Sequence, residues 1–189
     1  IQHQVILTGE NSFLRLAERE GEEPTTHLSH WRVLFSPVGP GHTAFLRSEL
    51  TDDEPRVYSD NIALARWLQK NIQGSMTPEY ADLSLPVLDA EFSKSGDART
   101  FWTETIESDE DMIDLTWYSF GEPIAVNSAV GSSPERPHGV LSCLVPAVGA
   151  QVTINGTTAE GRPWPTEMEG RPSSTCCLAF SETWLLPFE

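Results

Sequence analysis

The chain has 189 residues, of which 39% are hydrophobic and 21% charged, so it is long and apolar enough to bury a substantial core. Its 12 Lys and Arg against 28 Asp and Glu give a net charge of −16, a field that repels nucleic acid and anionic membrane surfaces, so neither is expected as a partner. The length predicts a single domain over residues 1–189.

Before residue 60 the sequence predicts one short helix and three strands. Apolar side chains recur at helical spacing over residues 12–20, and Gly21 is placed to stop that helix. Residues 28–35 and 42–50 are predicted to be two strands, which the turn rich in Pro and Gly between them joins into a hairpin. A brief strand over residues 56–58 follows.

One sizeable helix is expected in the middle of the chain, near residues 61–73. Ser59 or Asp60 is placed to cap its start, and Gly74 to end it. Its apolar side chains lie on one stripe, which predicts that this stripe is buried. The stripe consists of Ile62, Leu64, Ala65, Leu68 and Ile72.

The second half of the chain changes to a period of two, which is typical of strands. Turn signals such as Asn155-Gly156 separate the strands, and a long irregular loop is expected over residues 161–174. The fold class predicted is mainly β (α+β), an antiparallel meander that closes as a barrel or sandwich and in architecture resembles lipocalin-like barrels. The predicted strands are 86–93, 99–107, 112–120, 124–129, 139–145, 150–154 and 175–186.

Glu182 is the leading candidate for a catalytic residue. Strict alternation along residues 175–186 places it between Phe180 and Trp184 on the most apolar face of the chain, where loss of water suits a carboxylic acid to acid or base work. Glu104 is the second candidate, because it shares a strand face with a tryptophan in the same way. Both carboxylates are expected to point into one pocket. The alternative is that Glu182 only stabilises the fold, either by pairing with an inward arginine or by capping a barrel end through hydrogen bonds.

His30 and Arg32 share one face of the predicted strand over residues 28–35. His30 is the third catalytic candidate, and Arg32 is expected to orient or polarise a substrate oxygen or, alternatively, to neutralise a buried glutamate. Aromatic side chains on the same inward faces are expected to form an apolar wall for substrate binding. These side chains are Trp102, Trp117 and Trp184.

No metal site and no cofactor is predicted. The histidine spacings match no common metal motif, the three cysteines lack Cys-x-x-Cys spacing, and no Gly-rich phosphate loop follows a strand. One arrangement stays open, in which His30, His42 and Glu49 converge across the first hairpin. A metal bound there would replace the paired carboxylates as the functional centre.

These patterns favour a small-molecule enzyme with a β-barrel pocket, a metal-independent acid/base lyase, hydratase or isomerase that acts on a partly apolar, oxygenated metabolite. Two alternatives stay open: a non-catalytic, lipocalin-like module that binds a small-molecule ligand, and an interaction or assembly subunit. The odd number of cysteines and the lack of a membrane-length apolar stretch favour a soluble, cytoplasmic protein.

Overall fold

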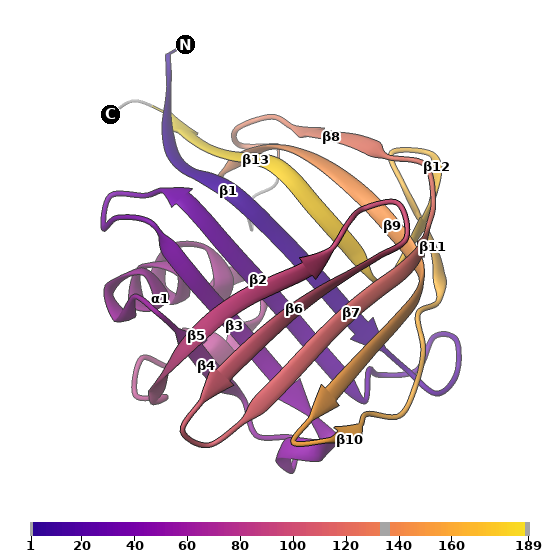
Figure 1. The fold of residues 1–189 in the computed structure, drawn as a ribbon. Coiled ribbons are helices and arrows are strands. Elements are labelled where there is room, and N and C mark those ends of the chain that lie inside the picture. The colour runs from indigo at the N-terminus through magenta and orange to yellow at the C-terminus, as the bar shows by residue number, and fades with distance from the viewer. Residues whose placement is uncertain (1, 133–136, 188–189) are drawn as a thin grey trace.

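The computed structural model describes residues 2–132 and 137–187. Strands account for 59% and helical segments for 12% of the chain, so the prediction of a mainly β fold is confirmed. Nine strands form one sheet that closes on itself, and the helical segments lie against its outside (Figure 1). None of the described helices is long and apolar enough to cross a membrane.

The nine strands of the ring come from both halves of the chain. They are β1 (His3–Leu16), β2 (Thr26–Phe35), β3 (Gly41–Ser48), β4 (Arg56–Ser59), β5 (Val87–Gly96), β6 (Phe101–Ser108), β7 (Met112–Phe120), β9 (Gly139–Ile154) and β13 (Cys177–Pro187). Around the ring the order is β9, β13, β1, β2, β3, β4, β5, β6 and β7, and β7 pairs with β9 to close it. Among the strands of the described residues, only β4 and β5 are parallel neighbours.

Four short strands lie outside the ring. β8 pairs with residues 140–144 in the first part of β9, and β10 pairs with the end of β9. β11 and β12 form a separate hairpin. The turn before β10 is the one that the sequence predicts, because Asn155 and Gly156 both have positive φ angles, of 52° and 81°. The bounds are β8 (Ile124–Ser128), β10 (Thr157–Thr158), β11 (Pro165–Met168) and β12 (Arg171–Ser174).

Parallel strands cannot be joined by a tight turn, and the helical segments supply the crossover from β4 to β5. The helix predicted in the middle of the chain is therefore confirmed, although it continues past Gly74, whose φ of −65° is helical, instead of ending there. A separate single turn, η1 (Glu49–Thr51), follows β3. The crossover consists of α1 (Ile62–Leu68), the π-helical turn η2 (Gln69–Gln73), α2 (Gly74–Met76) and the 3-10 turn η3 (Pro78–Ala81).

The start and the buried stripe of α1 differ from the prediction in two details. Asn61, and neither Ser59 nor Asp60, caps the helix, because its Oδ1 accepts the N–H of Leu64 at 3.2 Å. Four members of the predicted stripe are fully buried against the barrel, but Ile62 is 55% exposed. It lies in the first helical turn, at the rim of an open cleft, where no strand covers it.

Three other predictions for the chain path are wrong. Residues 3–16 form the strand β1 where a helix was expected over 12–20, since Leu14 and Leu16 alternate into the barrel and β2 and β13 pair with β1 on both sides. The expected loop over 161–174 contains the hairpin of β11 and β12. Residues 139–154 form one continuous strand, where two were predicted.

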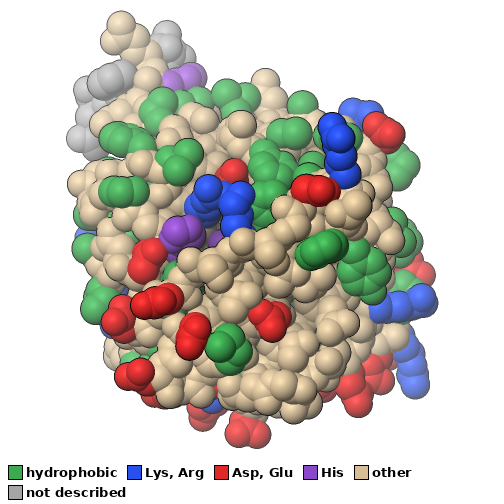
Figure 2. Space-filling view, in the orientation of Figure 1, with side chains coloured by type: hydrophobic (Ala, Val, Ile, Leu, Met, Phe, Trp, Pro, Cys, Tyr) green, Lys and Arg blue, Asp and Glu red, His purple; other side chains and the backbone are tan. Residues whose placement is uncertain are grey.

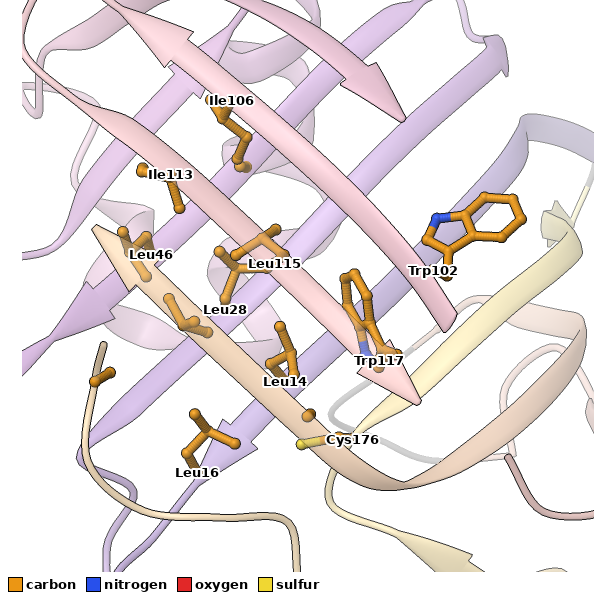
Figure 3. Packing of buried hydrophobic residues seen from close by; sticks show 14 of the residues in the cluster. Leu14, Leu16, Leu28, Leu46, Trp102, Ile106, Ile113, Leu115, Trp117 and Cys176 are labelled. Carbon is orange, nitrogen blue, oxygen red and sulfur yellow. The ribbon is translucent and has the colours of Figure 1, made fainter. Parts of the chain in front are cut away.

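Apolar side chains from opposite walls fill the interior of the barrel. Leu14 and Leu28, on β1 and β2, belong to one buried cluster with Leu115 and Trp117 on β7, and Figure 3 shows these side chains in the space between the two walls. The indole N–H of Trp117 donates to the carbonyl oxygen of Phe13 at 3.1 Å. This part of the barrel is a packed core.

One end of the barrel is closed by a polar network around Asp111. Arg56 and Tyr58 donate to its Oδ2 at 2.7 and 2.6 Å, and Asn155 donates to its Oδ1 at 3.0 Å. Burial alone raises the pKa of Asp111, but these hydrogen bonds outweigh it and lower the pKa. The carboxylate is thus held in place by its partners, and the network closes this end of the barrel.

Candidate functional site

The opposite end of the barrel brings together four titratable or cationic side chains that point inward. His30 and Arg32 alternate along β2, and His42 lies directly opposite Arg32 on β3. Glu104 reaches the same place from β6, because its Oε2 lies 3.9 Å from His30 Nε2. Three residues that the sequence predicts for the site, His30, Arg32 and Glu104, thus lie at this end of the barrel. Their functional roles stay predictions.

His30 and Glu104 form the deepest pair of this group, and both side chains are buried. Burial, together with the neighbouring His42 and Arg32, lowers the pKa of His30 to about 3, so its ring is neutral at pH 7. Desolvation raises the pKa of Glu104. His30 Nε2 has no hydrogen-bond partner in the described part of the chain. At pH 7 His30 therefore adds no positive charge to the buried pair, and its Nε2 faces the Glu104 carboxyl group.

Trp102 fixes the orientation of Glu104. Its indole N–H donates to Glu104 Oε1 at 2.7 Å, as their shared strand face predicts. The Lys94 ammonium lies 4.3 Å from the centre of the Trp102 ring, and Phe180 packs against the same ring edge-to-face at 5.6 Å. One carboxylate oxygen is thus occupied by Trp102, and the other faces His30.

Asp60 and His42 form a hydrogen-bonded pair that was not expected from the sequence. Asp60 Oδ2 lies 2.7 Å from His42 Nδ1, and Asp60 Oδ1 accepts the backbone N–H of His42 at 2.6 Å. A carboxylate only accepts, so Nδ1 carries the proton and Nε2 is left as the basic nitrogen. Gly41 makes room for this contact, because a Cβ there would lie 2.7 Å from Asp60 Oδ1. The sequence does not distinguish this role of Asp60, because an Asp directly before a helix is also typical of a helix cap.

His42 connects the buried pair to solvent. Its ring centre lies 6.3 Å from that of His30, and Phe92 stacks on it at 5.1 Å. Arg32, His42 and Asp60 line an open cleft, whose apolar part includes Leu34. We call this cleft, together with His30 and Glu104 beneath it, the barrel mouth. On the face shown in Figure 2, basic and histidine side chains lie side by side among many acidic ones.

Glu182 and Trp184 do not lie at the barrel mouth, and the expected alternation of β13 is wrong at this point. Ser181 has a φ of 53°, and the pairing of β13 with β9 shifts register between Phe180 and Thr183. This bulge moves every later side chain to the other face. Glu182 and Trp184 consequently lie on the outside of the barrel wall, where they line a separate cleft with Asn11.

Outside the barrel, Glu182 is tied into the wall. The indole N–H of Trp184 donates to Glu182 Oε1 at 2.6 Å, and the Ser142 hydroxyl donates to Oε2 at 3.0 Å. The third predicted wall residue, Trp117, lies in the packed core beneath the barrel mouth, in register with Trp102. Of the three tryptophans predicted to share a wall, only Trp102 therefore contacts the residues of the mouth.

Replacing Glu182 by Gln should lower the free energy of unfolding by about 1–2 kcal/mol, because the neutral amide oxygen accepts the Trp184 N–H more weakly than a carboxylate does, and the Ser142 hydroxyl must turn to accept the amide N–H₂. Urea unfolding measures the change. The control is Glu167→Gln at an exposed position on β11, which should change stability little. Equal stability of both variants would contradict a structural role for Glu182.

The possible metal cluster of His30, His42 and Glu49 is not assembled. Glu49 follows the far end of β3 from His42, and its Oε1 accepts the backbone N–H of Glu160 at 2.8 Å. Across residues 2–132 and 137–187, no three His, Cys, Asp or Glu side chains are grouped to hold a metal ion. His42 and Glu49 lie at opposite ends of β3, so the length of the strand keeps them apart although both belong to the predicted hairpin.

At the barrel mouth, Asp60 thus orients the imidazole of His42 beside the guanidinium of Arg32. The buried pair of His30 and Glu104 lies beneath them. Compared with protein-family models, with curated proteins and with solved structures, the chain gives no match in any of the three.

Proposed function

We propose that the protein is a small-molecule enzyme that performs acid/base chemistry at the barrel mouth, on a partly apolar metabolite that carries an anionic oxygen group. The reaction class is that of a lyase, hydratase or isomerase. The observation that carries the proposal is the Asp60–His42 pair, with its 2.7 Å contact, next to Arg32 in a cleft open to solvent. A carboxylate that fixes the tautomer of a histidine is a recurrent way to build a general base.

Each residue of the mouth has a distinct role in this proposal. His42 Nε2 takes or returns the proton of the substrate, and Asp60 holds the ring and stabilises its charged form. Arg32 binds the anionic oxygen, for which its guanidinium is held in place by Glu10 at 3.4 Å. Leu34, which is exposed on the cleft, contacts the apolar part of the substrate.

His30 and Glu104 complete the scheme as positioning residues. The neutral, buried His30 supports the polar face of the mouth without adding a second positive charge beside Arg32 and His42. Desolvation raises the pKa of Glu104, so burial works against a negative charge beneath the substrate. The cysteines Cys143, Cys176 and Cys177 are free thiols, which supports a reducing, cytoplasmic setting for this chemistry.

A non-catalytic binding module is the second candidate. It is favoured by the burial of His30 and Glu104, neither of which lines the open cleft. In that case Arg32 and His42 would hold an anionic ligand, and no proton would move to carbon.

Hydrogen exchange at carbon separates the two functions. The protein is incubated in D₂O with pyruvate, α-ketobutyrate and phenylpyruvate, which combine a carboxylate with an acidic C–H and differ in apolar size. Loss of the C–H signal is followed by NMR. The wild-type protein should accelerate exchange of at least one of them, and His42→Gln should lower that rate by about 100-fold. Arg32→Gln should raise the concentration needed for half-saturation.

The control variants are His3→Gln and Arg19→Gln, which change the same residue types at exposed positions away from the mouth. Both should exchange at the wild-type rate. Saturable binding that Arg32→Gln weakens, without any accelerated exchange, would establish the binding module in place of the enzyme. Absence of binding by all three acids would overturn both.

A further inference from the structure

A second cleft lies on the outside of the barrel wall, away from the barrel mouth. Its floor is formed by outward side chains of β1, β9 and β13, and its sides by the chain after α2 and by β11. It encloses about 330 Å³, which is within the range of small-molecule sites. We call it the outer cleft. None of its lining residues belongs to the barrel mouth.

The outer cleft is lined mainly by apolar surface. Phe13 and Leu144 form part of the floor, Met168 projects from β11, and Trp184 closes one end. Flexible thioether side chains such as those of Met76 and Met168 adapt to ligands of irregular shape. This lining suits a largely apolar molecule.

Several polar side chains of the outer cleft are held in place by hydrogen bonds within the protein, and one such network holds Thr77, directly after α2. Gln73 Nε2 donates to Thr77 Oγ1 at 3.1 Å and to Ser29 Oγ at 3.5 Å. Gln73 Oε1 accepts the indole N–H of Trp31 at 2.9 Å. On the opposite side, Glu182 accepts hydrogen bonds from Trp184 and Ser142. The shape of the cleft is therefore fixed before any ligand arrives.

One polar atom in this setting stands apart. The side chain of Asn11 lines the cleft and is only 9% exposed, and its Oδ1 has no hydrogen-bond partner in the described part of the chain. A buried carbonyl oxygen without a donor costs free energy, which a ligand that supplies one donor recovers. Asn11 Oδ1 is thus a polar anchor beside the apolar side chains of Phe13 and Leu144 on the floor of the cleft.

We propose that the outer cleft is a binding site for an uncharged, largely apolar ring compound with a single N–H or O–H group. This group donates a hydrogen bond to Asn11 Oδ1. This site is independent of the proposed chemistry at the barrel mouth. A fully apolar ligand would leave Asn11 Oδ1 unsatisfied, and a strongly polar one would be desolvated against Phe13, Leu144 and Met168.

Indole and indene test the proposal, because they share a ring shape and differ in the presence of the N–H donor. Binding is measured by titration of the ¹⁵N-labelled full chain with each compound. Indole should shift the amide signals of Asn11 and Ser29 and the indole N–H signal of Trp184, and should bind about tenfold more tightly than indene. The near-isosteric variant Asn11→Leu should abolish this preference.

A second variant tests the location without altering Asn11. Met168→Trp fills the cleft from β11 and should weaken indole binding by about tenfold or more, whereas Met112→Trp, at an exposed site on β7, should not change it. Equal affinities for indole and indene would overturn the role of Asn11. Shifts confined to the barrel mouth, or no effect of Met168→Trp, would overturn the outer cleft as the site.

Discussion

Replacing Leu68 by Asp should lower the free energy of unfolding by about 3–5 kcal/mol, enough to unfold a protein of ordinary stability. Leu68 is fully buried where α1 packs on the outside of the barrel, in one cluster with Trp31 and Phe45. A carboxylate there loses its water and gains no charged partner in exchange. Urea unfolding followed by far-ultraviolet circular dichroism measures the loss.

Ile62→Asp is the matched control, because it makes the same chemical change on the same helix. Ile62 is 55% exposed, so the new carboxylate stays hydrated, and it lies in the first turn, where negative charge suits the helix dipole. Its stability should stay within about 0.5 kcal/mol of wild type. If Leu68→Asp were as stable as Ile62→Asp, α1 would not pack on the barrel as described.

Stability should fall steeply as the pH is lowered from about 7.5 to about 4.5, and His30 should account for much of the fall. Its pKa is about 3 in the folded protein against 6.5 for the ordinary value, so between these limits the unfolded chain binds a proton that the folded chain refuses. The resulting stability is complete above pH 6.5 and is lost as the pH falls toward 3. Between about pH 7.5 and about pH 4.5, the contribution of His30 to the free energy of unfolding falls by roughly 3 kcal/mol.

Two other groups modify this pH dependence. His27, whose pKa burial lowers to about 4, adds to the loss. Glu104 opposes it, because its raised pKa means that the folded state binds a proton before the unfolded chain does. The effect of His30 alone is therefore read from the difference between variants.

His30→Gln removes the titrating ring, so its unfolding free energy should change between the two pH values by roughly 3 kcal/mol less than that of wild type. Exposed His3→Gln serves as the control and should keep the wild-type dependence. Urea unfolding at both pH values gives these differences. An unchanged pH dependence in His30→Gln would show that His30 is not buried in its neutral form.

Most of the β-strands could be predicted from the sequence because their alternation is a local property. Residues 112–120 form β7 with the predicted bounds, and the turn at Asn155-Gly156 follows from the few residues that accept positive φ. The helix predicted over 12–20 is wrong because the apolar run of Phe13, Leu14, Leu16 and Ala17 contains both the spacing of three to four residues of a helix and the spacing of two of a strand. Pairing with β2 and β13, which lie far away in the sequence, decided between them.

The candidate site shows the same division. The strand faces of His30, Arg32 and Glu104 could be predicted because two undisturbed strands carry them, and alternation holds along each. The predicted strand face of Glu182 is wrong because one residue before it, Ser181, adopts a left-handed conformation. A serine does not indicate that conformation in the sequence.

By itself, then, the sequence determined the strand content, the turn chemistry and which neighbours on one strand share a face, because each depends on backbone geometry within a few residues. Only the tertiary structure decided how the ring closes, where β13 bulges, and that Asp60 meets His42 across 18 positions of the chain. These depend on pairing and packing between distant segments, whose free energies are set by partners that no local pattern names.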